Sequence, residues 1–449
     1  MRSWLCAIAV VVVAAGCGGE DEDVGAELQA IPGVTASEWT PPSGVEPEAG
    51  YRYFDLTFEE PVDHEDPGAG TFEVKAELMH RDSAAPLVVV VNGYDVSWGR
   101  NLSEPAALVA GNQISIEYRF YGESKPAGGV PWPKLRVSQW SEDQHDIVQK
   151  LESIYTGARI ATGGSKGGEN ALQQMQLHPE DYAGAVAYVP PVITAFPDER
   201  YEGILDRIGI DSCRQALRAV ARQLLVRRLR MQPLVAASGT FEVVGVAHAF
   251  ETAAVELEFS FWMTRGIHDC VDVPDAMAAD NDLYAFLVGT SPPTGYDDDT
   301  LATSGTQYLY QDYIELGYPV LDHAYLDDLL QYSYEDWSDY LPPGEPHAYD
   351  PAMAQSLADW VTNDSQHVLL VGGEWDPWSA GYPPVAPGRD AYELIVPEAS
   401  HWSTSIYALP QADRDSAVGA LAKWAGVPFG EDRIRPPHAP MAAPERRWR

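Results

Sequence analysis

The stretch ARIATGGSKGGENALQQ, residues 158–174, constrains the fold more than any other part of the chain. It begins with an apolar run typical of a strand and ends in good helix formers, so a strand-to-helix turn is predicted at its glycines. The turn fits the pattern G-x-S-x-G, in which a sharp elbow presents a serine, here Ser165, at the end of a strand. The glycines around Ser165 remove the Cβ atoms that would collide in so tight a turn.

Strand-like and helix-like segments alternate along the chain. Runs typical of strands occur at residues 53–91, 113–120, 158–162, 184–192 and 367–378. A helix is predicted to open at Ser141, which forms a capping box with Gln144. Because strands that alternate with helices form parallel sheets, the pattern predicts an α/β fold.

Residues 196–361 consist of long stretches with a helical pattern, without intervening runs typical of strands. We interpret them as a mostly helical cap inserted into the α/β core before the acid-bearing strand, which suits a chain too long for one core. The expected organisation is a signal peptide (1–16), an acidic tether (17–35), the first part of the core (36–195), the cap (196–361), the second part of the core (362–430) and a disordered tail (431–449).

The N-terminus predicts export. A positive Arg2, a short apolar run at residues 4–15 and small residues before Cys17 are typical of a bacterial lipoprotein signal, in which the cysteine is acylated. We therefore expect an exported lipoprotein held by this lipid at the outer membrane or the cell surface. The alternative is a plain secretory signal.

The remaining cysteines, Cys213 and Cys270, both lie in the predicted cap. Exported proteins meet oxidising conditions, so we expect these two residues to form a disulfide that contributes ~3 to 4 kcal/mol to stability. Two separate buried thiols are the alternative.

The net charge of −38 excludes nonspecific nucleic-acid binding as a main activity, because phosphates would be repelled. It favours cationic partners, of which a free peptide N-terminus is one. Arg214, Arg218 and Arg222 share one helix face and form either a cationic wall for a substrate carboxylate or ion pairs with acidic residues of the cap.

A nucleophilic serine needs a histidine that a carboxylate orients. In this type of fold the acid and the histidine follow late strands, and HVLLVGGEWDPW and YELIVPEASHW supply Asp376 and His401 in that position. Glu374 and His145 are the alternatives, although His145 lies within a predicted helix.

An oxyanion hole needs two backbone N–H donors. We expect them from Lys166, which follows the serine, and from Tyr94, in the loop after the buried strand PLVVVV. Asn92 is expected to fix that loop. The sequence indicates no metal and no cofactor, because no helix carries the usual close pairing of histidine and acidic ligands.

The motifs PVDHEDPGAGTF, NGYDV, EYRFYGESKP, TGGSKGG, ELGYP and DPWS, in this order, resemble the secreted prolyl tri/tetrapeptidyl aminopeptidase family of bacterial serine peptidases. The resemblance covers about residues 55–401. It implies an α/β-hydrolase with a helical cap, a triad of Ser165, Asp376 and His401, and release of short peptides from free N-termini with proline beside the cleaved bond.

Such a substrate needs a carboxylate to pair with its ammonium group and flat aromatic walls for its proline. Glu117 is the first candidate for the carboxylate and Glu315 the second, with a structural ion pair as the alternative for each. Trp378 and Trp402 are candidates for the walls, although such aromatics can also be core.

Two other functions remain open at this point. A carboxylesterase would use the same triad and oxyanion hole on an ester. A tethered hydrolase-like binding protein would need no activated serine, so a complete triad argues against it.

Overall fold

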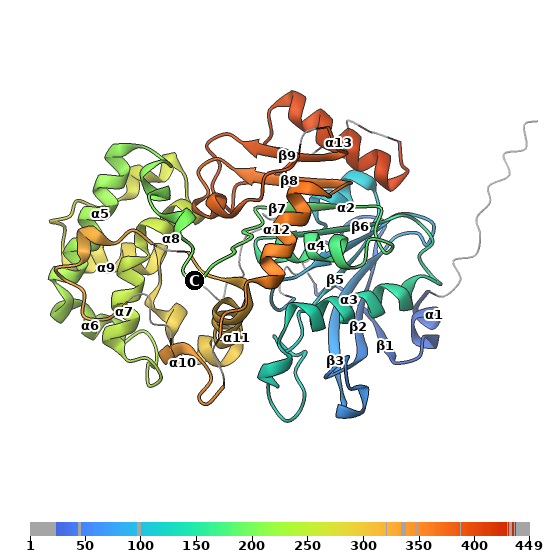
Figure 1. The fold of residues 1–449 in the computed structure, drawn as a ribbon, viewed down its shortest axis with the longest axis horizontal. Helices are drawn as coiled ribbons and strands as arrows, with labels where there is room; N and C mark the ends of the chain where they lie inside the picture. Colours follow the sequence, from blue (N-terminus) through green and yellow to red (C-terminus); the bar gives the residue numbers. More distant parts are fainter. Residues whose placement is uncertain are drawn as a thin grey trace, which may run out of the picture.

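The computed structural model describes residues 24–436 except 44–45, 97–99, 320, 334–337, 346–347, 387, 429, 431–432 and 435. The expected signal peptide, Cys17 and most of the expected tail lie outside the described residues. An α/β core and a helical cap lie side by side (Figure 1). Within the described residues, no helix combines the length and the apolar character needed to cross a membrane.

Nine strands of the described chain form one sheet in the order β1-β2-β3-β5-β4-β6-β7-β8-β9. The strands are β1 (Val34–Trp39), β2 (Arg52–Pro61), β3 (Thr71–His80), β4 (Leu87–Val91), β5 (Asn112–Ile116), β6 (Arg159–Gly164), β7 (Gly184–Tyr188), β8 (Val368–Gly373) and β9 (Ala391–Val396). The pairs β1–β2, β2–β3 and β3–β5 are antiparallel, and all others are parallel. The carboxyl ends of β4, β6, β7, β8 and β9 therefore meet at one edge, where the expected site residues follow.

Helices cover both faces of the sheet, which explains why β4 is apolar throughout. Leu87, Val89 and Val91 pack in one apolar cluster, and Val88 and Val90 pack in another on the opposite face. The first face carries α3 (Val137–Leu151), α4 (Lys166–Leu177) and α12 (Ala352–Asn363), and the second carries α2 (Glu104–Val109) and α13 (Gln411–Ala425). This is the α/β-hydrolase core that the sequence predicts.

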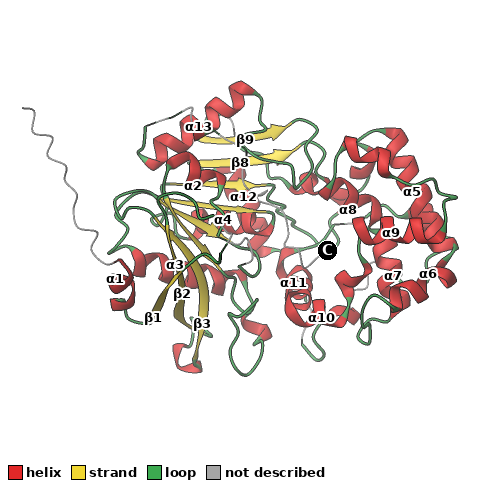
Figure 2. Cartoon of the chain, turned by 180° about the vertical axis from the view of Figure 1, so that it is seen from behind, coloured by secondary structure: helices red, strands yellow, loops and turns green. Residues whose placement is uncertain are grey.

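The cap has an apolar core of its own. Its helices are α5 (Asp211–Val226), α6 (Arg228–Ala236), α7 (Val246–Val255), α8 (Leu257–Thr264), α9 (Asp280–Thr290), α10 (Asp298–Thr300) and α11 (Thr306–Gln311). In Figure 2 the cap is drawn in helices and loops, while the strands lie in the core. Leu224, Phe250 and Leu287, from three cap helices, are fully buried in one apolar cluster.

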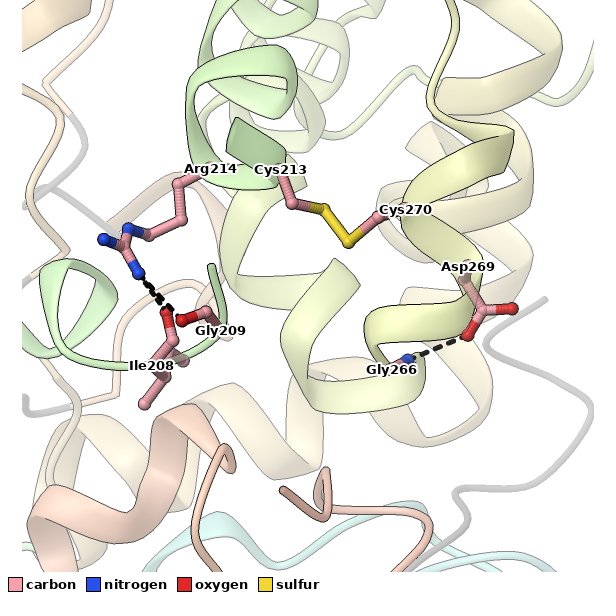
Figure 3. The surroundings of a disulfide bond; sticks show 7 residues. All are labelled: Ile208, Gly209, Cys213, Arg214, Gly266, Asp269 and Cys270. Carbon is pink, nitrogen blue, oxygen red and sulfur yellow. Dashed lines mark hydrogen bonds between the residues drawn. A yellow bond between two sulfur atoms is a disulfide. The ribbon is translucent and has the colours of Figure 1, made fainter. Parts of the chain in front are cut away.

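The predicted disulfide is present in the cap. Cys213, in the first turn of α5, is bonded to Cys270, in the short helix Ile267–Asp272, with their Cα atoms 5.6 Å apart (Figure 3). The bond joins residues 57 positions apart in the sequence. It ties the start of α5 to the segment that follows α8.

The arginine face of α5 is held by ion pairs, which confirms the second of the two interpretations. Arg214 pairs with Asp211, Arg218 with Asp206 and Glu258, and Arg222 with Asp328. These cations are therefore neutralised within the cap and do not form a wall of the cavity described below.

Three predicted boundaries are wrong. Part of the expected tether is the helix α1 (Val24–Ala30), because Val24 and Leu28 pack into the core with 2% and 0% of their surface exposed. The cap ends before residue 361, because α12 packs on the sheet through Leu357. Helix α3 begins at Val137, so Ser141 is a buried residue inside the helix and not its cap.

Candidate active site

Ser165 lies at the sharp turn that the sequence predicts. Its φ of 57° is a conformation that residues with a Cβ rarely adopt, and its N–H donates to the Tyr188 carbonyl at 2.9 Å. A Cβ added at Gly163 would come within 2.3 Å of the Gly167 oxygen, and one at Gly167 within 2.3 Å of the Val91 oxygen. The glycines are thus required by the close approach of β6, α4 and β4. Ser165 stands at the N-terminus of α4, whose dipole favours negative charge there.

The acid and the histidine come together from the ends of β8 and β9. His401 Nδ1 lies 2.7 Å from Asp376 Oδ2, and these residues are 2% and 0% exposed. Asp376 Oδ1 also accepts the Trp378 N–H at 2.9 Å, and Tyr382 donates its hydroxyl to Oδ2. Because the carboxylate occupies the Nδ1 side of the ring, His401 is left with Nε2 as the nitrogen that can serve a nucleophile.

Ser165 and His401 line the same cavity, which has a volume of about 620 Å³. The structure therefore brings together the three residues predicted from the motifs. Neither predicted alternative lines this cavity. Glu374 is exposed and accepts the Glu398 N–H. His145, on α3, bonds to Asp181 and stacks on His178.

The two predicted oxyanion donors belong to segments in close contact. A Cβ added at Gly93 would lie 2.8 Å from Lys166 Cβ and 2.9 Å from Gly167 N, so the loop after β4 rests directly on the elbow. Gly93, Tyr94 and Ser165 all line the cavity. Asn92 donates to the Ile116 carbonyl at 2.9 Å, as expected of a residue that fixes this loop.

The Lys166 side chain is buried beneath the cavity, with 3% of its surface exposed. Its Nζ lies 3.9 Å from the centre of the Tyr118 ring and 4.6 Å from that of Tyr121. Burial lowers the pKa of Lys166 to about 7 and raises the pKa of nearby Glu169 to about 8. Sequence reasoning used only the backbone of Lys166 and gave no sign of this buried cluster.

The two tryptophans predicted to bind substrate both line the cavity. The Trp378 indole N–H points to the Met263 sulfur at 3.2 Å, and the Trp402 backbone N–H donates to the Met263 carbonyl at 3.2 Å. Met263 belongs to α8, so the loops that carry Asp376 and His401 are held directly against the cap.

Glu117 and Glu315, which were predicted to bind the substrate's ammonium group, instead accept hydrogen bonds from backbone N–H groups. Glu117 does follow a core strand, but its carboxylate turns back into the next loop and accepts from Val96, Glu123 and Ser124 at 2.8 to 3.0 Å. Glu315 accepts the Val137 N–H at 2.9 Å, which holds the start of α3. Neither residue lines the cavity.

A different acidic residue, Glu256, does line the cavity. It lies between α7 and α8, and it accepts hydroxyls from Tyr296 at 2.5 Å and from Tyr318 at 3.3 Å. Sequence analysis missed Glu256 because it is one of several acidic residues in an unbroken helical stretch. Only the packing of the cap shows which of them faces Ser165's cavity.

Glu104 is a second residue that the sequence did not reveal. Its buried carboxylate accepts the Ile406 and Tyr407 N–H groups at 2.8 and 2.7 Å and the Tyr188 hydroxyl at 2.8 Å. Burial raises its pKa. It thereby anchors the loop after His401 to the strand β7, beside the elbow.

The sequence matches known proteins along almost its whole length. The profile of the PS-10 peptidase S37 family matches residues 20–446. The prolyl tri/tetrapeptidyl aminopeptidase of Streptomyces mobaraensis is 36% identical over 426 residues, which cover 92% of this chain and 87% of that protein.

Among solved structures, a proline iminopeptidase from Mycobacterium smegmatis matches with a TM-score of 0.40 and 14% identity, over 82% of this chain and 98% of its own. A haloalkane dehalogenase loop variant from Bradyrhizobium elkanii matches with a TM-score of 0.39 and 12% identity, over 83% of this chain and 98% of its own. The family itself rests on the sequence matches, which confirm the resemblance stated above. The chain belongs to the S37 family of serine peptidases.

Proposed function

We propose that this peptidase releases tri- or tetrapeptides from free N-termini, with proline beside the cleaved bond. The activity named for the Streptomyces mobaraensis relative supports this substrate class. The observation that carries the proposal is one cavity lined by Ser165, His401 and Glu256. A nucleophile and its base thus share one cavity with a carboxylate that can bind an ammonium group.

In the proposed reaction, Ser165 Oγ attacks the carbonyl carbon of the scissile bond while His401 Nε2 takes its proton. Asp376 holds the imidazole through Nδ1 and stabilises its cationic form. The backbone N–H groups of Tyr94 and Lys166 bind the oxyanion. The protonated histidine then gives the proton to the leaving amine, and water hydrolyses the acyl-enzyme with His401 again as the base.

The proline preference is proposed from the aromatic walls beside the nucleophile. Tyr94, Tyr308 and Trp378 line the cavity together with Ser165. Flat aromatic faces suit the compact pyrrolidine ring, which offers no N–H once it is within a peptide bond. A cavity of about 620 Å³ is also within the usual range for a small bound molecule.

Glu256 is the proposed partner of the substrate's ammonium group. Two tyrosine hydroxyls fix its carboxylate on the wall of the cavity that holds Ser165. Two deeply buried acids near the nucleophile, Glu169 and Asp312, suit this role less well. Glu169 and Asp312 border only a hollow of about 20 Å³, and burial raises the pKa of both, to about 8 for Glu169.

A mixed peptide library, with and without N-terminal acetylation and read by mass spectrometry, tests the proposal. We expect short peptides to be released only from free N-termini, with proline at the new C-terminus. Cleavage within acetylated chains would contradict the exopeptidase assignment. Release of single residues or of peptides without proline would contradict the proposed substrate class.

We also propose that the protein is an exported lipoprotein anchored through Cys17. Small residues before this cysteine and the short apolar run support the proposal. Expression with radiolabelled palmitate should label the wild type in the membrane fraction. Equal labelling of a Cys17→Ser variant would contradict the anchor.

A further inference from the structure

The Lys166 side chain joins the two segments that are expected to form the oxyanion hole. Lys166 follows Ser165 directly, and its Nζ donates to the Gly93 carbonyl at 2.6 Å, within the loop after β4. Nζ also donates to Gln311 Oε1 at 2.7 Å and to the Tyr121 hydroxyl at 3.3 Å. The three acceptors match the three N–H donors that Nζ carries in its protonated form.

The carbonyl that Lys166 holds belongs to the same peptide unit as the Tyr94 N–H. In a trans peptide the C=O and the N–H point in opposite directions. A donor fixed at 2.6 Å on the Gly93 oxygen therefore fixes the direction of the Tyr94 N–H, which points away from the ammonium group. Hydrogen bonding to the carbonyl also polarises the peptide and strengthens its N–H as a donor.

We propose that Lys166 is a positioning residue that orients and polarises the Gly93–Tyr94 peptide, so that the Tyr94 N–H is presented to the oxyanion. The inference rests on the proposed serine mechanism but not on the proposed peptide substrate. Lys166 then contributes to the oxyanion hole in two ways. Its backbone N–H is one donor, and its side chain orients the peptide that carries the other donor.

The surroundings of Nζ are built to keep it in this place. The rings of Tyr94, Tyr118 and Tyr121 lie 5.3, 3.9 and 4.6 Å from Nζ, which is the geometry of favourable cation–π contacts. Gln311 in turn donates to the Tyr118 hydroxyl at 3.1 Å, so its oxygen is the atom that faces Lys166. The side chain therefore has a single arrangement set by four neighbours.

Substitution of Lys166 by methionine tests the inference, because methionine has a similar length and no donor. We expect kcat to fall about 10- to 100-fold on both a peptide and an activated ester, with KM unchanged, since weakening an oxyanion donor affects the transition state. Affinity for a peptide aldehyde, whose adduct carries the oxyanion, should fall by the same factor. Affinity for a product peptide should not change.

The matched control is Lys150→Met. Lys150 lies on α3, outside the lining of the cavity, and its Nζ pairs with Glu60 Oε1 at 2.5 Å. Its replacement removes a lysine charge and should leave kcat unchanged. Should Lys166→Met fail to fold, Lys166→Gln replaces it, because the shorter amide stays polar but cannot reach Gly93. We expect the same loss of kcat from Lys166→Gln.

A folded Lys166 variant with wild-type kcat and aldehyde affinity would overturn the inference. A change confined to KM would overturn it as well, because orientation of the oxyanion donor does not act on ground-state binding alone. The activated ester allows the role of Lys166 to be tested independently of the proposed peptide substrate. If wild-type protein cleaves the ester but not the peptide, the substrate proposal fails and the role of Lys166 is still tested.

Discussion

The carboxyl edge of the sheet and the helical cap both line the cavity, but they are built in different ways. At the sheet edge, Ser165, Asp376 and His401 each follow a strand, so the order of the strands places them. In the cap, Glu256 lies at the junction of α7 and α8 and Met263 lies on α8. Helix α7 packs in an apolar cluster separate from the sheet. The comparison indicates that topology positions the proposed triad, whereas helix packing positions Glu256, the residue proposed to select the substrate.

The two regions also differ in what holds them. Strained backbone and close glycine contacts fix the elbow, where an added Cβ meets a carbonyl oxygen at 2.3 Å. The cap combines its own apolar cluster with a disulfide and with ion pairs, several of which are partly exposed. Changes at the sheet edge should therefore abolish turnover in a folded protein, and changes in the cap should alter stability or selectivity.

The largest effect is expected at the nucleophile. Ser165→Ala should reduce kcat on the order of a million-fold, because the triad acts as a unit. The fold should be retained, since the removed hydroxyl carries no backbone contact of the elbow. A phosphonylating probe should label Ser165 in the wild type and not in the variant, as read by peptide mapping. Labelling of a different serine would contradict the assignment of Ser165 as the nucleophile.

Asp376→Asn is expected to have the next largest effect. It removes the anion that accepts from His401 and Tyr382, and in the best-studied serine peptidase the same change costs about 10,000-fold in kcat. Steady-state kinetics measures the loss. Glu374→Gln is the matched control, because Glu374 is exposed and only holds the turn at Glu398. An equal loss in both variants would contradict the assignment of the acid.

Loss of the disulfide should affect stability more than chemistry. The double variant Cys213→Ser/Cys270→Ser opens a loop between residues 57 positions apart, which should cost about 3 to 4 kcal/mol in the free energy of unfolding of the cap. Denaturant unfolding followed by hydrogen exchange should show the cap opening before the sheet. Simultaneous opening of both regions would show that the cap is not a separate unit of stability.

The sheet edge could be predicted from the sequence because its signals are local. An apolar run, a glycine cluster and a helix former identify the elbow, and the late strands locate Asp376 and His401. The side-chain positions that the sequence did not predict depend on tertiary packing. The position of Glu117 at a strand end was correct, but its carboxylate turns toward the N–H groups of a following loop, which no local pattern reveals.

In the cap, too, the sequence predicts local structure but not the positions that tertiary packing decides. Its helical character and its disulfide could be predicted from composition and cysteine count, because neither depends on how the helices pack. The role proposed for Glu256 depends on which side of the α7–α8 junction faces the sheet, and this is decided by apolar contacts between distant residues. For the same reason, the sequence did not show that α12 belongs to the core.

The most direct test of this division between chemistry and selection is the ratio of kcat/KM for one proline-containing peptide in free and N-acetylated form. In the wild type the free peptide should be strongly preferred. Glu256→Gln should lower kcat/KM for the free peptide by ~10- to 100-fold, because an ammonium–carboxylate pair contributes ~1.5 to 3 kcal/mol, and should leave an amine-free ester unaffected. Asp95, which follows Tyr94 in the loop after β4, is the other carboxylate on the cavity wall and therefore the competing candidate. Asp95→Asn should preserve the ratio, and a loss of the ratio in this variant would move the ammonium-binding role from Glu256 to Asp95. Equal cleavage of both peptides by the wild type, or equal slowing of peptide and ester by Glu256→Gln, would contradict the account.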